Sequence, residues 1–194
     1  MIIFLKSPTG IFLKAGGSCL AIYGPGPRPE DEVKIGNQIW SKKNLDYDDG
    51  GEGIQTYTVN YGHGDVTEHY YSWDAAVRVA SSIPGWHLPS DAEYAELLAA
   101  VGGYTVAGTK LKATYGWAAG AEGTDNYGFC ILPAGLVNKY GTMSNVGTST
   151  SLWTADSTSW DSAKRRSVTN KATIYNADDA NKTMKMIIRL VKDS

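Results

Sequence analysis

A polar stretch near the C-terminus contains the residue types best suited to holding a ligand. Residues 156–183 include four Asp, four Ser, four Thr and three Asn, which is 15 of 28 positions. The large apolar side chains there are Trp160, Val168, Ile174 and Tyr175. We expect so polar a segment to be exposed to solvent rather than to form a buried sheet. Two interpretations remain open: a solvated loop, or a binding face of short polar side chains with interspersed Tyr, Trp and Arg, as in antibody paratopes.

On the second interpretation, aromatic and arginine side chains would supply most of the binding free energy, as they do at measured interfaces. The favoured contacts are Trp160, Arg165, Arg166, Tyr175, Asn176 and Asp178. The complete set of predicted ligand-binding residues, all within Trp153–Lys182, is Trp153, Asp156, Ser157, Ser159, Trp160, Ser162, Arg165, Arg166, Ser167, Thr169, Tyr175, Asn176, Asp178, Asp179 and Asn181.

The other residues capable of chemistry give little support for catalysis. Cys19 and Cys130 lie far apart in the sequence, and without an export signal two free buried thiols are favoured over a disulfide. His63 and His69 lack an obvious third partner, so the pattern indicates no zinc site. No Gly-x-Ser-x-Gly, phosphate-binding or dinucleotide-binding motif occurs. We therefore expect the protein not to be an enzyme.

An acidic segment raises the question of calcium. Asp46, Asp48, Asp49 and Glu52 supply carboxylates, but their order is not that of an EF-hand loop. A solvated loop is favoured, and a calcium site stays open as the weaker alternative. We therefore predict no cofactor and no metal site.

The charge balance argues against a nucleic-acid partner. Eighteen Lys and Arg against 20 Asp and Glu give a formal net charge of −2, without the basic excess of general DNA- or RNA-binding proteins. No stretch approaches the roughly 20 apolar residues that span a bilayer, so we expect no membrane insertion. The first ten residues lack a basic n-region and do not resemble a secretory signal.

The N-terminal part of the chain reads as a small β appendage. Apolar runs at 2–5 and 11–13 are separated by a turn cluster and predict a hairpin, and a third strand is expected over 19–23. The proline-rich stretch that follows fixes backbone angles and removes hydrogen-bond donors. We place a boundary there, between an appendage over 1–30 and a domain over 31–194.

Two helices are predicted in the first half of the domain. Ser72 can cap a helix over Trp73–Ser82. The sequence Ser90-Asp91-Ala92-Glu93 matches a capping box. The helix that follows has one apolar stripe, formed by Tyr94, Leu97, Leu98 and Val101. Gly102-Gly103 ends this helix.

From residue 104 onward the sequence shows no sustained helical period. Brief strands are expected at Gln38–Trp40 and Tyr57–Val59, and a closing strand at Met184–Lys192. The order is β, two helices, then a long glycine-punctuated, loop-rich second half. Without an alternating βαβ pattern, this order predicts an α+β fold with small antiparallel sheets.

Several short motifs occur in an order and spacing that resemble a known family. They are Ile35–Trp40, Lys43–Leu45, Tyr70–Ala76, Gly85–Tyr94, Thr124–Phe129, Leu132–Gly135, Trp153–Asp156 and Ile188–Asp193. The strongest, Gly-Trp-His-Leu-Pro-Ser-Asp-Ala-Glu-Tyr, is similar to the Gly-Trp-Arg-Leu-Pro-Thr-x-x-Glu-Trp motif of the Fibrobacter succinogenes major paralogous domain. The resemblance covers about residues 33–193.

This resemblance implies a C-type-lectin-like fold, related to formylglycine-generating-enzyme-like domains, whose loop-rich second half displays a binding face. His87 stands where the family has Arg, so we expect it to be a structural donor. The proline motifs of calcium-dependent sugar-binding lectins are absent, which argues against that mode of binding. The tryptophans at 40, 73, 86 and 117 are expected in the core, and Arg189 is expected to pair with a carboxylate or carbonyl groups.

Domains of this kind are also frequent targets of diversity-generating retroelements, often in phages. Such elements scatter Asn, Ser, Asp, Thr, Ala and Tyr over a fixed scaffold, and residues 153–183 carry this mixture directly before the closing motif. Lys and Trp are not direct products of randomised Asn codons. Four positions would therefore be unvaried, namely Trp160, Lys164, Lys171 and Lys182.

The sequence thus predicts a receptor-recognition protein with a variable binding face near its C-terminus. It would be displayed on a phage tail or a cell surface and bind a host-surface protein or glycan. Its N-terminal segment could mediate homo-oligomerisation. The alternative is a fixed carbohydrate- or protein-binding adhesin module on a bacterial surface.

Overall fold

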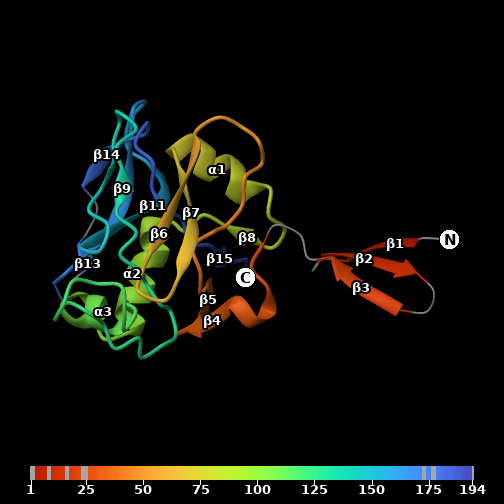
Figure 1. Ribbon diagram of the computed structural model, residues 1–194, viewed down its shortest axis with the longest axis horizontal. Coiled ribbons are helices and arrows are strands. Elements are labelled where there is room, and N and C mark those ends of the chain that lie inside the picture. The colour runs from red at the N-terminus through yellow and green to blue at the C-terminus, as the bar shows by residue number, and fades with distance from the viewer. Residues whose placement is uncertain are drawn as a thin grey trace.

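The computed structural model describes the backbone of residues 3–7, 10–15, 18–22, 26–171, 174–175 and 178–193, and side chains within 26–28, 30–171 and 178–193 (Figure 1). The helices are the 3-10 helix η1 (Pro29–Asp31), α1 (Trp73–Ser81), α2 (Asp91–Ala100) and α3 (Tyr104–Leu111). The strands are β1 (Ile3–Ser7), β2 (Gly10–Ala15), β3 (Ser18–Ile22), β4 (Glu32–Ile35), β5 (Gln38–Ser41), β6 (Ile54–Asn60), β7 (Asp65–Tyr71), β8 (Trp86–His87), β9 (Leu136–Val137), β10 (Met143–Ser144), β11 (Ser149–Ser157), β12 (Ser162–Thr169), β13 (Ile174–Tyr175), β14 (Asp179–Asn181) and β15 (Val191–Lys192).

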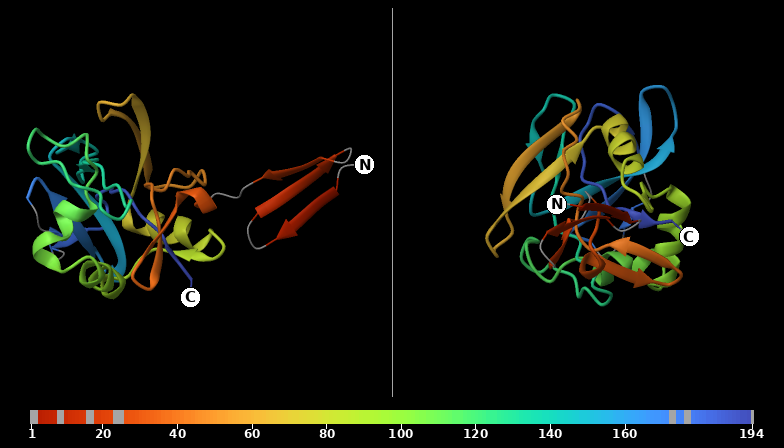
Figure 2. Two further views of the ribbon diagram at one scale, coloured as in Figure 1. Left: turned by 90° about the horizontal axis from the view of Figure 1, so that it is seen from below. Right: turned by 90° about the vertical axis from the view of Figure 1, so that its right-hand side faces the viewer.

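The strands form several small antiparallel sheets, and with the helices they make an α+β fold, as predicted. Strands β1, β2 and β3 form an antiparallel meander, which confirms the predicted hairpin and third strand. This sheet stands apart from the other elements in Figures 1 and 2. In the part of the chain that the structure describes, no helix is long and apolar enough to cross a membrane.

The two predicted helices are confirmed together with their caps. The Ser72 side chain accepts a hydrogen bond from the Ala75 amide at the start of α1. At α2, Ser90 and Glu93 form the predicted capping box, with both reciprocal bonds present. These caps satisfy backbone donors that a helix cannot pair internally, and they fix where each helix begins.

The prediction of no helix after residue 104 is wrong, because α3 follows α2 almost directly. Its N-cap is Gly103 at φ 94°, and no side chain caps the helix. The residues Ala107, Gly108 and Leu111 bury one face of α3. Without a capping residue and with Gly108 inside it, this short helix lacks the usual start signal and is held by packing.

The closing part of the chain joins the first strands of the domain. Strand β15 pairs with β5 and β8, in the sheet order β4-β5-β15-β8, and Val191 lies opposite Trp40. The predicted strand over Met184–Lys192 is regular only at its end. Lys185, Met186 and Ile187 instead form isolated bridges to three different segments. This arrangement ties the end of the chain into several parts of the core.

The strands β11 and β12 lie between two clusters of buried side chains. Leu152 and Val168 belong to one cluster, and Trp153 and Ala163, together with Ala180 of the neighbouring strand β14, belong to the other. Because side chains alternate across a strand, the hairpin buries both of its faces at its base. The expectation that the polar stretch would not form a buried sheet is therefore wrong for this part. Small alanines fill the inner positions where large apolar residues were looked for.

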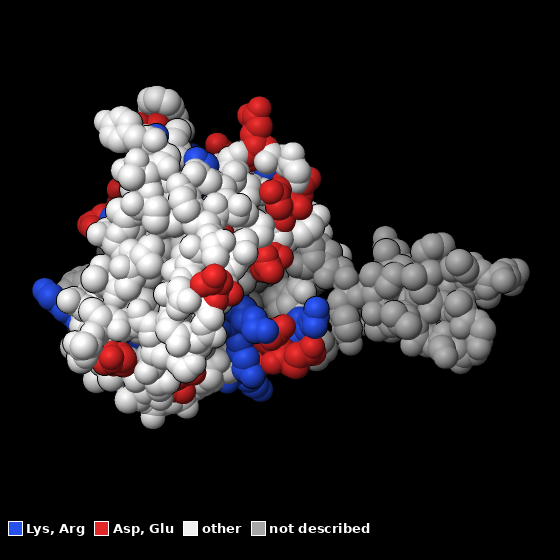
Figure 3. Space-filling model, viewed as in Figure 1, with Lys and Arg blue, Asp and Glu red and all other residues white. Residues whose placement is uncertain are grey.

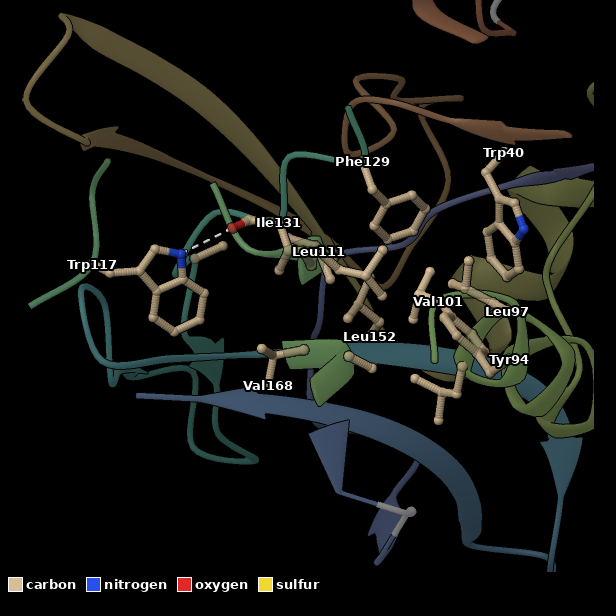
Figure 4. Close-up of a cluster of buried hydrophobic side chains, with 14 of the residues drawn as sticks. Trp40, Tyr94, Leu97, Val101, Leu111, Trp117, Phe129, Ile131, Leu152 and Val168 are labelled. Carbon is tan, nitrogen blue, oxygen red and sulfur yellow. Dashed lines mark hydrogen bonds between the residues drawn. The ribbon is translucent and has the colours of Figure 1, made fainter. Parts of the chain in front are cut away.

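The first cluster is built around aromatic side chains from both halves of the domain (Figure 4). The Trp40 ring packs against Tyr94 and Phe129, with centroid distances of 5.0 and 5.7 Å. The Trp117 indole donates to the Ile131 carbonyl at 3.0 Å. Trp40, Trp86 and Trp117 are buried as predicted, whereas Trp73 is partly exposed. This core holds the base of strands β11 and β12 in place.

Candidate ligand-binding site

The base of the β11–β12 hairpin is scaffold rather than binding face. Trp153 is fully buried and its indole donates to the Tyr71 carbonyl at 2.8 Å. Arg166 is 2% exposed and lies 2.7 Å from the Asp91 carboxylate. Both were predicted to contact a ligand, and this is corrected because neither side chain reaches the surface.

Charged side chains fasten this base to the N-terminus of α2. The Asp91 amide donates to the Asp156 carboxylate at 2.6 Å, and the Arg166 guanidinium also donates to the Asp91 carbonyl at 2.9 Å. Lys164 lies 3.4 Å from the same Asp91 side chain. A carboxylate at a helix N-terminus is stabilised by the helix dipole. Asp156, a predicted contact, is therefore engaged in holding the hairpin against the helix.

The tip of the hairpin, residues 157–162, is held by a dense set of hydrogen bonds. The Ser159 and Ser162 hydroxyls donate to the Asp161 carboxylate at 2.7 and 3.0 Å. These bonds hold the pKa of Asp161 below its usual value. The Lys182 ammonium donates to the Ser157 hydroxyl at 2.8 Å and the Ser159 carbonyl at 2.9 Å. The same ammonium lies 4.3 Å from the Trp73 ring centroid.

Trp160 projects from this ordered tip into solvent. Its side chain is 90% exposed, the most exposed of the large hydrophobic side chains that the structure describes. Leaving an indole in water is unfavourable, because its apolar surface stays hydrated. The tip thus presents a large amphipathic ring on a backbone that is already ordered.

The remaining predicted contacts divide by position. Arg165 is half-buried opposite Trp153, its guanidinium lies 3.4 Å from the Ser151 hydroxyl, and burial lowers its pKa. Asp178 and Asp179 are exposed at the start of β14. The half-buried side chains are Ser162, Ser167, Thr169 and Asn181. The side chain of Tyr175 and all of Asn176 lie outside the described residues.

A second exposed ring was missed by the sequence analysis. Tyr140 is 80% exposed on the turn between β9 and β10. The Asn138 side chain accepts hydrogen bonds from the Tyr140 and Thr142 amides at 2.9 and 3.1 Å. The available signal was Asn138 followed three residues later by Gly141, a pattern typical of an ordered turn.

Two carboxylates of the acidic segment and two of the histidines pair with oppositely charged side chains. Arg78 pairs with Asp49 at 2.8 Å and lowers the pKa of that carboxyl to about 2. His69 lies 3.0 Å from Asp46. His87 lies between the Asp193 and Glu93 carboxylates, at 2.6 and 2.7 Å, which agrees with its expected role as a donor. No group of three or more potential metal ligands comes together among the described residues.

A buried polar network around Arg189 connects segments that are distant in sequence. Arg189 is 1% exposed and donates to the Ser41, Phe129 and Cys130 carbonyls at 2.8–2.9 Å. It also donates to Asn44, whose amide donates to both oxygens of buried Glu68. Burial raises the pKa of Glu68, against the lowering effect of the bonds from Asn44 and Tyr61. The expectation of carbonyl partners for Arg189 is confirmed.

Cys130 carries a half-buried free thiol whose pKa is raised by burial. Its backbone has φ 51°, and the Asp125 carboxylate accepts a hydrogen bond from its amide at 2.8 Å. A thiol with a raised pKa is less nucleophilic at neutral pH, since the thiolate is the reactive form. The side chain of Cys19 lies outside the described residues.

Comparison with known proteins identifies the family. Residues 33–192 match the model of the Fibrobacter succinogenes major domain, so the chain belongs to this family. No curated protein and no solved structure matches the chain. The matched region begins within β4 and ends within β15, the strands at the two ends of the domain's sequence.

Proposed function

We propose that the protein is a ligand-recognition domain of C-type-lectin-like type, and that the β11–β12 tip is its binding face. The observation that carries this proposal is Trp160, 90% exposed on a tip whose polar groups are already hydrogen-bonded. A ring on a rigid backbone loses little conformational entropy when it binds. The small antiparallel sheets beside helices support the lectin-like comparison.

A retroelement-diversified face is the form of this function that the residue types favour. Asp178 and Asp179 are exposed beside a scaffold of buried side chains and make none of the bonds that order the tip, so substitutions there would leave both the core and the tip intact. The protein would be displayed on a phage tail or a cell surface and bind a host-surface molecule without catalysis. A fixed adhesin module of a bacterial surface is the second candidate, because an exposed Trp160 would contact the ligand in a fixed binding face as well as in a diversified one.

The test uses fluorescently labelled full-length chain on intact microbial cells from the habitat of its source. We expect it to label some cell types, and Trp160→Ala to remove the labelling. Tyr104→Ala is the control, because Tyr104 is an exposed ring on α3, away from the tip in Figure 1. Labelling that survives Trp160→Ala, or no labelling of any cell type, would contradict the proposal.

A further inference from the structure

The turns that carry Tyr140 and Trp160 reach the same end of the domain. Gly135 forms a parallel bridge with Thr150, so the chain runs in one direction through β9 and β11 toward the two turns. Val137 pairs antiparallel with Lys185, which brings residues 181–184 to this end as well. Figure 1 and the right-hand view of Figure 2 both show the teal turn after β9 and the blue tip after β11 at the top of the molecule, and in the right-hand view of Figure 2 the two stand apart with α1 between them.

Both turns are ordered before any ligand arrives. The Asn138 side chain closes the first turn, and the Tyr57 hydroxyl donates to the Gly141 carbonyl at 2.9 Å, which fixes that turn to β6. The bonds of Asp161 and Lys182 order the second turn. The Lys139 ammonium lies 5.2 Å from the centroid of the Tyr140 ring and covers one face of it. The opposite face remains for contact.

We infer that Tyr140 and Trp160 together form a two-ring platform for a carbohydrate chain, an inference that rests on the proposed function. The C–H groups of a sugar ring carry partial positive charge and stack on the negative face of an aromatic ring. Apart from the two rings and a glycine, the turns at 138–142 and 157–162 consist of polar residues, whose side chains suit sugar hydroxyls.

A protein partner is less well matched to this end of the domain. Stable protein interfaces have a contiguous apolar centre ringed by polar residues. Here each ring stands on its own turn among hydroxyl, amide and charged groups. Figure 3 likewise shows acidic and basic side chains interspersed on the drawn face rather than one large patch of a single sign. A chain of sugar units can instead meet the two rings at separate points.

The experiment is an array of immobilised oligosaccharides and polysaccharides probed with the full-length chain, followed by calorimetry with shortened forms of whichever glycan binds. We expect Trp160→Ala and Tyr140→Ala each to weaken binding of the long glycan by about tenfold or more, the effect of losing an aromatic contact. Tyr104→Ala should leave affinity unchanged. The shortest bound fragment should respond to one of the two ring variants and not the other.

Three results would overturn the inference, and they bear differently on the proposed function. Glycan binding that depends on Trp160 but not Tyr140 would remove the two-ring platform and keep the function. Cell labelling that depends on Trp160, is lost after protease treatment and survives periodate oxidation would identify a protein ligand instead. Glycan or cell binding unaffected by either ring variant would overturn both. Thermal melts establish that every variant is folded.

Discussion

At the scale of single residues, the buried guanidinium of Arg189 joins parts of the domain that are distant in sequence. It donates to carbonyl groups of Ser41, Phe129 and Cys130, and through Asn44 it reaches buried Glu68. Arg189→Met should lower the free energy of unfolding by about 3–5 kcal/mol, because it leaves three buried carbonyl oxygens and the Asn44 side-chain oxygen without their donor. Urea denaturation measures this change.

The matched control for Arg189 is a surface ion pair. Lys43 lies 2.8 Å from Asp31 with 75% of its side chain exposed. Lys43→Met should change stability by less than about 1 kcal/mol. Equal losses in the two variants would show that the buried network has no special role in stability.

His87 makes stability depend on pH. Desolvation lowers its pKa, but the bonds to Asp193 and Glu93 outweigh this and raise it. A group whose pKa is raised by folding stabilises the folded protein fully at pH values below its pKa in the unfolded chain. This stabilisation is lost as the pH rises through its pKa in the folded protein. His87→Arg, which stays charged, should remove that loss.

The comparison of wild type with His87→Arg is needed because Glu68 acts in the same direction. Its pKa is also raised in the folded protein, so it too destabilises as pH rises. Thermal melts of both proteins from about pH 5 to 9, a range that brackets the usual histidine pKa, measure the difference. A difference that does not change with pH would rule out His87 as the source.

At the scale of elements, the β11–β12 hairpin separates scaffold from surface, and its two tryptophans test that separation. Trp153 is fully buried and Trp160 is 90% exposed. Trp153→Ala should cost about 3–5 kcal/mol of stability, as for other buried large-to-small changes. Trp160→Ala should change stability by less than about 0.5 kcal/mol. Denaturant midpoints decide this, and a large loss for Trp160→Ala would mean that its ring packs in solution.

The β9–β10 hairpin depends on Gly135, just before β9, and on Gly141, in its turn, for two different reasons. Gly135 has φ 68°, and an added Cβ would lie 2.2 Å from the Ser144 carbonyl oxygen. Gly141 has φ 81°, but a Cβ there would meet nothing within 4 Å. Gly141→Ala should therefore cost about 1–2 kcal/mol for the left-handed backbone alone. Gly135→Ala should cost more, and thermal melts showing equal costs would refute the clash.

The elements that the sequence analysis predicted are those with local chemical signals. Ser72 and the Ser90–Glu93 capping box marked α1 and α2 because caps depend on nearby residues. Helix α3 was missed because Gly103 offers no side-chain cap. Strand β12 was predicted to be exposed, but Arg166 on this strand is buried because it pairs with Asp91, 75 positions away in the sequence. Such partners appear only once the chain is folded.

The proposed binding face was predicted in the same uneven way. Trp160 was found because an indole in a polar stretch is conspicuous. Trp153 and Arg166 were wrongly included because composition does not tell which face of a strand is buried. Tyr140 was missed because the turn that carries it lies outside the polar stretch, and only the bridge between Gly135 and Thr150 shows that this turn and the β11–β12 tip point to the same end of the domain.

At the scale of the whole molecule, one sheet joins the first and last strands of the domain, β4 and β15, and the turns after β9 and β11 project from a different region. Strand β15 closes the sheet with β5 and β8, while β9 and β11 lead to the turns that carry Tyr140 and Trp160. Changes in those turns therefore need not disturb the sheet that closes the domain. This division is what a scaffold with a changeable binding face requires.

The most direct measurement is deep sequencing of the 3′ end of the gene across a natural population of its source. The account predicts substitutions at exposed positions outside the hydrogen-bonded tip, such as Asp178 and Asp179, matched to a nearby adenine-rich template copy. Trp160 should stay constant as an aromatic anchor, and so should the buried residues Trp153, Ala163, Arg166, Val168 and Ala180. Substitutions spread equally over buried and exposed positions, or confined to the buried ones, would contradict a binding face on this hairpin.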